Sequence, residues 1–161
     1  MVNYWIFQGN EKYYRIDKEL EQERLDRDKR DKDYQGSKSL WPATRFKSEI
    51  EKGDKAFLWV TFPGSRDDQR GIFGILDILS KAEERHDEFG KYWRFKEDAD
   101  IKKPRVEYRY DKILDPPFFE SEIKKIEGLS NLSILKNHIG TNFRVRPEEW
   151  KIILREIEQN H

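Results

Sequence analysis

The 161-residue sequence contains no cysteine, which excludes a disulfide scaffold, a thiolate metal site and a thiol nucleophile. Its three histidines are scattered, and it has no HExxH motif or Asp-rich cluster, so we expect no metal site. The net charge is zero because 32 basic side chains balance 32 acidic ones, so no overall field draws the protein to a polyanion. Any contact with nucleic acid must therefore be local.

Long apolar runs and catalytic motifs are also missing. No stretch approaches the roughly 20 apolar residues of a membrane span, and the N-terminus lacks the charged start and cleavage site of a signal peptide. We therefore expect a cytoplasmic protein without membrane contact. The GxSxG, P-loop and GxGxxG motifs of hydrolases and nucleotide-binding enzymes are absent, so we expect a non-catalytic domain that needs no cofactor.

The patterns that are present predict an α+β fold. Strands are predicted at residues 3–8, 55–62, 72–79 and 105–110, and the second and third of them form an antiparallel hairpin. A highly charged helix is predicted at residues 11–33, and residues 147–158 form a helix that begins at Pro147 and has one apolar face. No repeat or linker interrupts the chain, so residues 1–161 are predicted to be a single domain around a curved, mostly antiparallel sheet.

Five tryptophans need places in this small domain, and their contexts differ. Trp5 and Trp150 lie at periodic positions of a predicted strand and a predicted helix, so we assign both to core packing. Trp41 follows a polar loop and is held extended by Pro42, because a residue before proline avoids the helical region. With the hydroxyl of Thr44 nearby, Trp41 suits a stacking platform for a flat ligand.

The remaining aromatic candidates lie in a strand and a charged loop. Strand alternation places Trp59 and Thr61 on one face, opposite the aliphatic side chains of the same strand. We expect the aliphatic face to meet the core and the other face to border a pocket; packing of Trp59 under the N-terminal helix is the alternative. Tyr92 and Trp93 either form a pocket wall or cover an edge of the core.

Four stretches of the chain, in order, read YWIFQGN, LWPATRFKSEIEKGDKAFLWV, RGIFGILDIL and NFRVRPEEWKIILREI. Together, and in this order, they resemble the EVE domains, which are relatives of the YTH readers in the PUA-like superfamily. The charged stretch from about residue 21 to 36 has no match and is interpreted as an insertion. The resemblance implies a PUA-like, YTH-like form of the α+β fold, in which the curved sheet is barrel-like and flanked by helices.

The resemblance also implies a reader of modified bases. In this superfamily a flipped-out base lies between aromatic side chains: YTH members read N6-methyladenine in RNA, and EVE domains occur in McrB-like restriction GTPases that recognise modified DNA. Carried to this sequence, the candidates for the aromatic cage are Trp41, Trp59, Tyr92 and Trp93, and those for hydrogen bonds to the base edge are Gln8, Asn10, Thr44 and Thr61. Cations near these segments are candidate phosphate contacts, namely Arg45, Lys47, Lys102, Lys103, Arg105 and Arg144.

The leading hypothesis is that the chain recognises DNA with a methylated base, such as N6-methyladenine or methylcytosine, in a McrB-type system with an AAA+ GTPase and a nuclease as partners. An RNA reader of the YTH type and a small-molecule or protein interaction domain are alternatives. A hydrolase of modified nucleotides is a further alternative, which the missing motifs disfavour. We also expect Trp41→Ala to weaken binding while leaving stability nearly unchanged.

Overall fold

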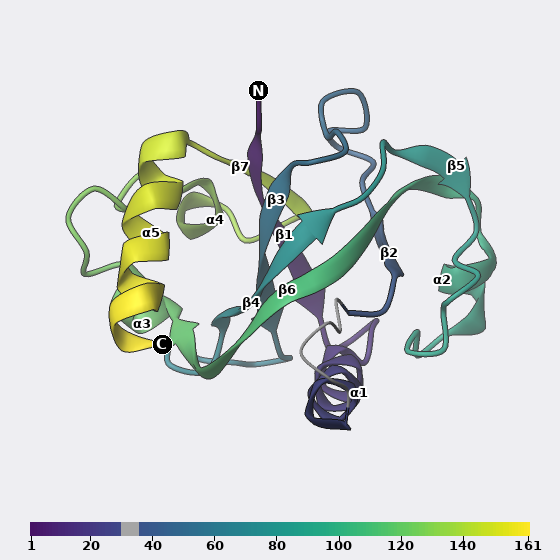
Figure 1. Ribbon diagram of the computed structural model, residues 1–161, viewed down its shortest axis with the longest axis horizontal. Coiled ribbons are helices and arrows are strands. Elements are labelled where there is room, and N and C mark those ends of the chain that lie inside the picture. Colours follow the sequence, from purple (N-terminus) through teal and green to yellow (C-terminus); the bar gives the residue numbers. More distant parts are fainter. Residues whose placement is uncertain (30–35) are drawn as a thin grey trace.

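The computed structural model describes residues 1–29 and 36–161, and a single curled β-sheet forms its centre (Figure 1). Neighbouring strands follow the order β2-β6-β4-β3-β1-β7, and β5 pairs with β6. β1 and β3 run parallel, whereas every other pair is antiparallel. The predicted α+β class with a curved, mostly antiparallel sheet is therefore confirmed. The strands are β1 (Tyr4–Asn10), β2 (Ser39–Pro42), β3 (Lys55–Thr61), β4 (Gly71–Ile78), β5 (Glu83–Arg85), β6 (Lys103–Phe119) and β7 (Asn142–Val145).

Helices pack on both faces of the sheet, α5 on one face and α1 on the other (Figure 1). Helix α5 begins at Pro147 as predicted and buries Trp150, Ile153 and Ile157. The N-terminal helix begins later than predicted, at Ile16; it takes up residues 21–29 of the predicted insertion, and residues 30–35 lie outside the described part of the chain. The helices are α1 (Ile16–Lys29), α2 (Lys96–Asp100), α3 (Glu120–Ile123), α4 (Ser133–Lys136) and α5 (Pro147–Asn160).

The curl of the sheet brings its two edge strands together. The side-chain Nδ2 of Asn142 in β7 donates a 3.0 Å hydrogen bond to the carbonyl oxygen of Pro42 in β2. Nearby, the ring of Phe7 in β1 stacks on that of Trp41 in β2, with centroids 5.9 Å apart. Pro42 is tolerated here because an edge strand needs no ladder bond from its outer side. The sheet is thus a half-barrel whose edges meet near Trp41.

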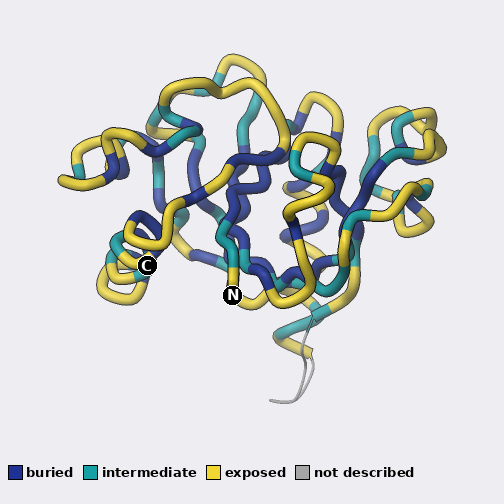
Figure 2. The backbone as a smooth tube through the Cα atoms, turned by 90° about the horizontal axis from the view of Figure 1, so that it is seen from above, coloured by how far each residue is buried: buried dark blue, intermediate teal, exposed yellow. Residues whose placement is uncertain are grey.

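Two hydrophobic clusters lie on the two faces of the sheet, and Figure 2 shows the buried strands between exposed loops. The α1 cluster, which includes Trp5, Phe7, Trp41, Leu58 and Tyr108, faces helix α1. The α5 cluster lies under helix α5 and includes Ile6, Phe57, Trp59, Phe143 and Trp150. The core assignment of Trp5 and Trp150 is confirmed. The expectation that only the aliphatic face of residues 55–62 meets the core is wrong, because β3 is an interior strand covered on both faces.

Within the described residues, no helix has the length and apolar character needed to cross a membrane.

Candidate nucleic-acid interface

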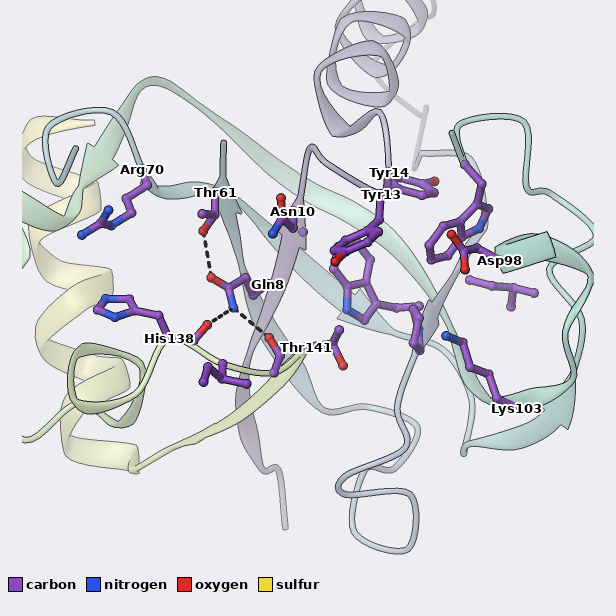
Figure 3. Close-up of a pocket in the computed structure, with 17 residues that line it drawn as sticks. Gln8, Asn10, Tyr13, Tyr14, Thr61, Arg70, Asp98, Lys103, His138 and Thr141 are labelled. Carbon is purple, nitrogen blue, oxygen red and sulfur yellow. Dashed lines mark hydrogen bonds between the residues drawn. The ribbon is translucent and has the colours of Figure 1, made fainter. Parts of the chain in front are cut away.

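A cavity of about 670 Å³ opens where the parallel strands β1 and β3 end side by side. Asn10 and Thr61, the last residues of these strands, are register partners, and both line the cavity. The other walls come from β2, from the segment between Trp93 and Lys103, and from the loop after α4 (Figure 3). Its volume lies within the roughly 300–1,000 Å³ usual for small-ligand sites.

One end of the cavity, the aromatic end, is formed by Tyr13, Tyr14, Trp41 and Trp93. Tyr14 meets Trp41 and Trp93 edge to face, with centroids 6.2 and 4.9 Å apart. Trp41 is only 4% exposed, yet it borders the cavity. Gly9 makes room for its indole, because a Cβ on Gly9 would lie 3.0 Å from Trp41 Cη2. The structure therefore brings Trp41 and Trp93 together, and it adds two tyrosines that sequence analysis had placed in a charged helix.

Buried carboxylates hold these rings in place. Glu19 in α1 accepts hydrogen bonds from the hydroxyls of Tyr14, Tyr108 and Tyr110 at 2.6–2.9 Å. Burial raises the pKa of Glu19 above its ordinary value, although the tyrosine hydroxyls act in the opposite direction. Asp87 similarly accepts a 2.7 Å hydrogen bond from Trp93 Nε1. The aromatic end is therefore a preorganised wall.

The opposite end of the cavity carries Arg70 and His138 (Figure 3). Arg70 donates two hydrogen bonds to the buried carboxylate of Glu120, at 2.9 and 3.2 Å, and His138 Nε2 lies 2.8 Å from the same carboxylate. Burial raises the pKa of Glu120, but the bonds from Arg70 and His138 outweigh it and leave that pKa below its ordinary value. This group could not be predicted from the sequence, because Arg70, Glu120 and His138 lie in separate segments that only the fold brings together.

Gln8 lies between the two ends, and its amide is already engaged. Its Nε2 donates to the carbonyl oxygens of His138 and Gly140 at 2.8 and 2.7 Å, and its Oε1 accepts a 2.8 Å hydrogen bond from Thr61 Oγ1. Gln8 therefore fixes the loop that walls the cavity, and its predicted hydrogen bonds to a base edge do not fit, because both polar atoms of its amide already have partners within the protein. Asn10 Oδ1 accepts from the Lys12 amide at 2.9 Å, and the described residues give its Nδ2 no partner.

Three of the other predicted site residues lie outside the cavity wall. Trp59 is fully buried in the α5 cluster, so its assignment to the cage is wrong. Trp59 and Thr61 are two residues apart on the same face of β3. At about 3.3 Å per residue, Trp59 therefore lies roughly 7 Å from Thr61 along the strand, among the side chains of the α5 cluster. Thr44 is exposed and does not reach the cavity. Tyr92 lines a smaller hollow beside α1 and meets Tyr14 edge to face at 6.1 Å, so it supports the aromatic end from behind.

Among the predicted phosphate contacts, Lys103 lines the cavity, and Arg45, Lys47 and Lys102 are exposed outside it. Arg105 is 0% exposed and donates to the carbonyl oxygens of Arg85, Asp98 and Ile101 at 2.8–3.1 Å. Its assignment to phosphate is therefore wrong: it stabilises the segment behind Trp93, and burial lowers its pKa. Arg144 is paired with Glu49 at 2.8 Å.

Among the residues that the structure describes, no group of three or more histidine, aspartate and glutamate side chains is placed to hold a metal ion. The cavity offers a ligand aromatic rings, hydrogen-bonding groups and nearby cations.

Known proteins share this architecture. The family model of the EVE domain matches residues 3–156. The chain is an EVE domain. Human THYN1, solved in complex with DNA containing 5-methylcytosine, is similar with a TM-score of 0.67 at 17% identity, over 99% of both chains. A hypothetical protein from Leishmania major has a TM-score of 0.66 at 18% identity, over 99% of this chain and 96% of its own.

A protein from Pseudomonas putida is also similar to this EVE domain, with a TM-score of 0.62 at 20% identity over 94% of this chain and 97% of its own. At such identities the likeness shows the fold alone, and that fold agrees with the curved, barrel-like, PUA-like sheet that the resemblance to the EVE domains implied. No curated protein matches the sequence.

Proposed function

We propose that this EVE domain binds DNA that carries a methylated base and takes that base into the cavity. The observation that carries the proposal is the aromatic end of a cavity of about 670 Å³, where rings from three separate segments surround one space. A nucleobase has two flat faces that stack on such rings. The complex of the similar protein THYN1 with DNA containing 5-methylcytosine supports this choice of ligand.

The energies are consistent with binding by base flipping. Extruding a base from a duplex costs a few kcal/mol. Stacking on aromatic side chains returns about 1–3 kcal/mol per base, and burying one methyl-sized group adds about 0.8 kcal/mol. Because Glu19 and Asp87 already fix the rings, little further ordering is needed when a base enters. We therefore expect moderate affinity and a several-fold preference for the methylated base.

Contacts with the DNA backbone must come from local cations, because the whole chain has no net charge. Arg45 lies beside the rim of the cavity, since its Nη1 is 3.8 Å from the point where a Cβ on Gly140, which lines the cavity, would be. With few such contacts, binding is expected to weaken only modestly as salt is added, because the salt dependence grows with the number of phosphates contacted.

Fluorescence anisotropy tests the proposal with duplexes that carry a single 5-methylcytosine or N6-methyladenine, the unmodified duplex, and the matching RNA strands. We expect a methylated DNA duplex to bind several-fold more tightly than its unmodified control. A 2-aminopurine beside the modified base should brighten when that base leaves the stack. Equal affinities for modified and unmodified DNA would overturn the proposal, and selectivity confined to RNA would make the domain an RNA reader instead.

The cellular setting is a finer proposal: this domain serves as the recognition module of a McrB-like restriction system, beside an AAA+ GTPase and a nuclease. Its support is that domains of the EVE family, whose model matches residues 3–156, occur in such systems as well as alone. The genes next to the one that encodes this chain provide the test. A GTPase or nuclease gene there is expected, and a neighbourhood devoted to RNA modification would contradict the proposal.

A further inference from the structure

The hydrogen-bonding groups that line the cavity are largely engaged within the protein. Gln8 and Thr61 bind each other, and Gln8 also binds two loop carbonyls. Arg70 and His138 are tied to Glu120 at the far end. A base at the aromatic end must therefore be read by other side chains.

Two charged side chains at the aromatic end differ from these. Among the described residues, neither the Asp98 carboxylate nor the Lys103 ammonium group takes part in a hydrogen bond or an ion pair, although both residues line the cavity. Figure 3 shows the two groups converging on the same space, one from α2 and the other from the start of β6. Lys103 Nζ lies 5.8 Å from the ring centroid of Trp93, so the space next to the stacking surface is flanked by an acceptor and a donor.

Lys103 is also held in a partly desolvated position. Burial lowers its pKa, the nearby Arg105 lowers it further, and Asp98 acts in the opposite direction. A half-buried cation that has the Trp93 ring beside it but no hydrogen-bond or ion-pair partner among the described residues is unfavourable, because burying a charge without pairing it is costly. A ligand that offers an acceptor to Lys103 and a donor to Asp98 would remove this penalty.

We propose that Asp98 and Lys103 read the edge of the base held at the aromatic end, and that the pair selects a cytosine-type base by accepting from its amino group and donating to its ring nitrogen. This inference rests on the proposed function and deepens it. An ionised carboxylate only accepts hydrogen bonds and an ammonium group only donates them. Aspartate and glutamate are the side chains that accept from N4 of cytosine.

Thymine is the natural comparison for 5-methylcytosine, because both bases carry the same ring and the same C5 methyl group. In thymine the amino group is replaced by a carbonyl oxygen and the ring nitrogen carries a proton, so donor and acceptor exchange places. Bound in the same orientation, thymine would set an acceptor against Asp98 and a donor against Lys103. Stacking and methyl burial are unchanged, so any difference in affinity isolates the reading of the edge.

The test measures the affinity of the full chain for duplexes with 5-methylcytosine or thymine opposite an abasic site, so that no base pair must be broken in either. The wild type should prefer 5-methylcytosine by about tenfold, the discrimination of one good edge contact. Asp98→Asn should lose or reverse this preference, because its amide can donate to the thymine carbonyl. Lys103→Met should weaken binding of 5-methylcytosine by about tenfold.

Glu97→Gln and Lys96→Met are matched controls, since both residues are exposed on α2 and neither lines the cavity. They remove the same charges and should leave the preference between the bases unchanged. Thermal melting confirms that each variant folds. If Asp98→Asn keeps the wild-type preference for 5-methylcytosine over thymine, as Glu97→Gln is expected to do, the inference is overturned. The proposal that the cavity binds a base is not affected by that result. If the wild type binds 5-methylcytosine no better than an unmodified site, the proposed function itself fails.

Discussion

The α1 cluster and the α5 cluster cover opposite faces of one sheet, but they differ in the polar groups buried among their side chains. In the α5 cluster, Trp150 stacks on Phe57 with centroids 3.8 Å apart, and neighbouring side chains are mostly aliphatic. In the α1 cluster, the buried carboxylate of Glu19 is surrounded by tyrosine hydroxyls, and a cavity opens at the edge of the cluster. The α5 cluster is therefore packed by apolar side chains, whereas the α1 cluster also holds a buried carboxylate and contributes Tyr14 and Trp41 to the cavity wall.

Trp41 and Trp59 show what separates the two faces. Both indoles are buried, and neither Nε1 has a partner among the described residues. Trp59 lies within β3, an interior strand, whereas Trp41 lies in the edge strand β2, close to where β1 and β3 end. Residue type and burial therefore do not distinguish a tryptophan inside the core from one that borders the cavity, whereas the position relative to the strand ends does.

The largest expected effect comes from Trp59→Ala. We expect the free energy of unfolding to fall by about 3–5 kcal/mol, because the change leaves a large cavity in a dry core. Urea denaturation of the purified variant measures this, with Trp59→Phe as the milder comparison. A loss below about 1 kcal/mol would show that the α5 cluster does not depend on this ring.

A smaller effect is expected from Glu19→Gln, and it should depend on pH. Removing an acceptor shared by three hydroxyls should cost about 1–3 kcal/mol. Because the pKa of Glu19 is raised in the folded state, its contribution is fully present below its ordinary pKa of 4.5 and is lost as the pH rises through the raised value. The deficit of the variant relative to the wild type should therefore be larger near pH 4.5 than near pH 7.

Urea unfolding at both pH values measures this deficit, and Glu21→Gln, on the exposed side of the same helix, is the control. A deficit that grows with pH would mean that the tyrosines stabilise the charged carboxylate more than burial disfavours it.

Much of the fold could be predicted from local patterns. The apolar alternation of β3 and β4 and the amphipathic pattern after Pro147 depend on neighbouring residues, so they are visible in the sequence. The full length of β6 was not predicted, because its second half contains Asp115, Pro116 and Pro117, which usually mark a turn. Strand β7 and the short helices depend on tertiary contacts and gave little local signal.

The site was harder to predict than the fold. Trp41 could be found because Pro42 and the preceding polar loop set it apart. Arg105 could not be separated from the surface cations around it, since the carbonyl oxygens that surround its guanidinium group come from other segments. Tyr14 was missed because the pattern of charges around it predicted a solvated helix, whereas its partner Glu19 is buried.

Trp41→Phe should affect binding more than stability. Trp59→Phe makes the same chemical change within the α5 cluster and serves as its control. Truncating Trp41 to alanine is less informative, because burial of this ring predicts a loss of stability that the sequence did not anticipate. With phenylalanine, the affinity for methylated DNA should fall about fivefold, since part of a stacking contribution of about 1–3 kcal/mol is lost. Anisotropy should show no such loss for Trp59→Phe, and equal losses would mean that the two faces are coupled.

The smallest effect is expected at the rim of the cavity, from Arg45→Gln. Its guanidinium group lies over Phe46 and Phe143, with distances of 5.2 and 5.9 Å to the ring centroids, and it takes part in no ion pair within the described residues. If it contacts one phosphate, the slope of log affinity against log salt concentration should become shallower by about 1. Lys151→Gln, on the exposed side of α5, removes the same charge and should leave the slope unchanged. Equal slopes for the two variants would place the DNA backbone elsewhere, because only a cation in contact with phosphate releases counterions on binding.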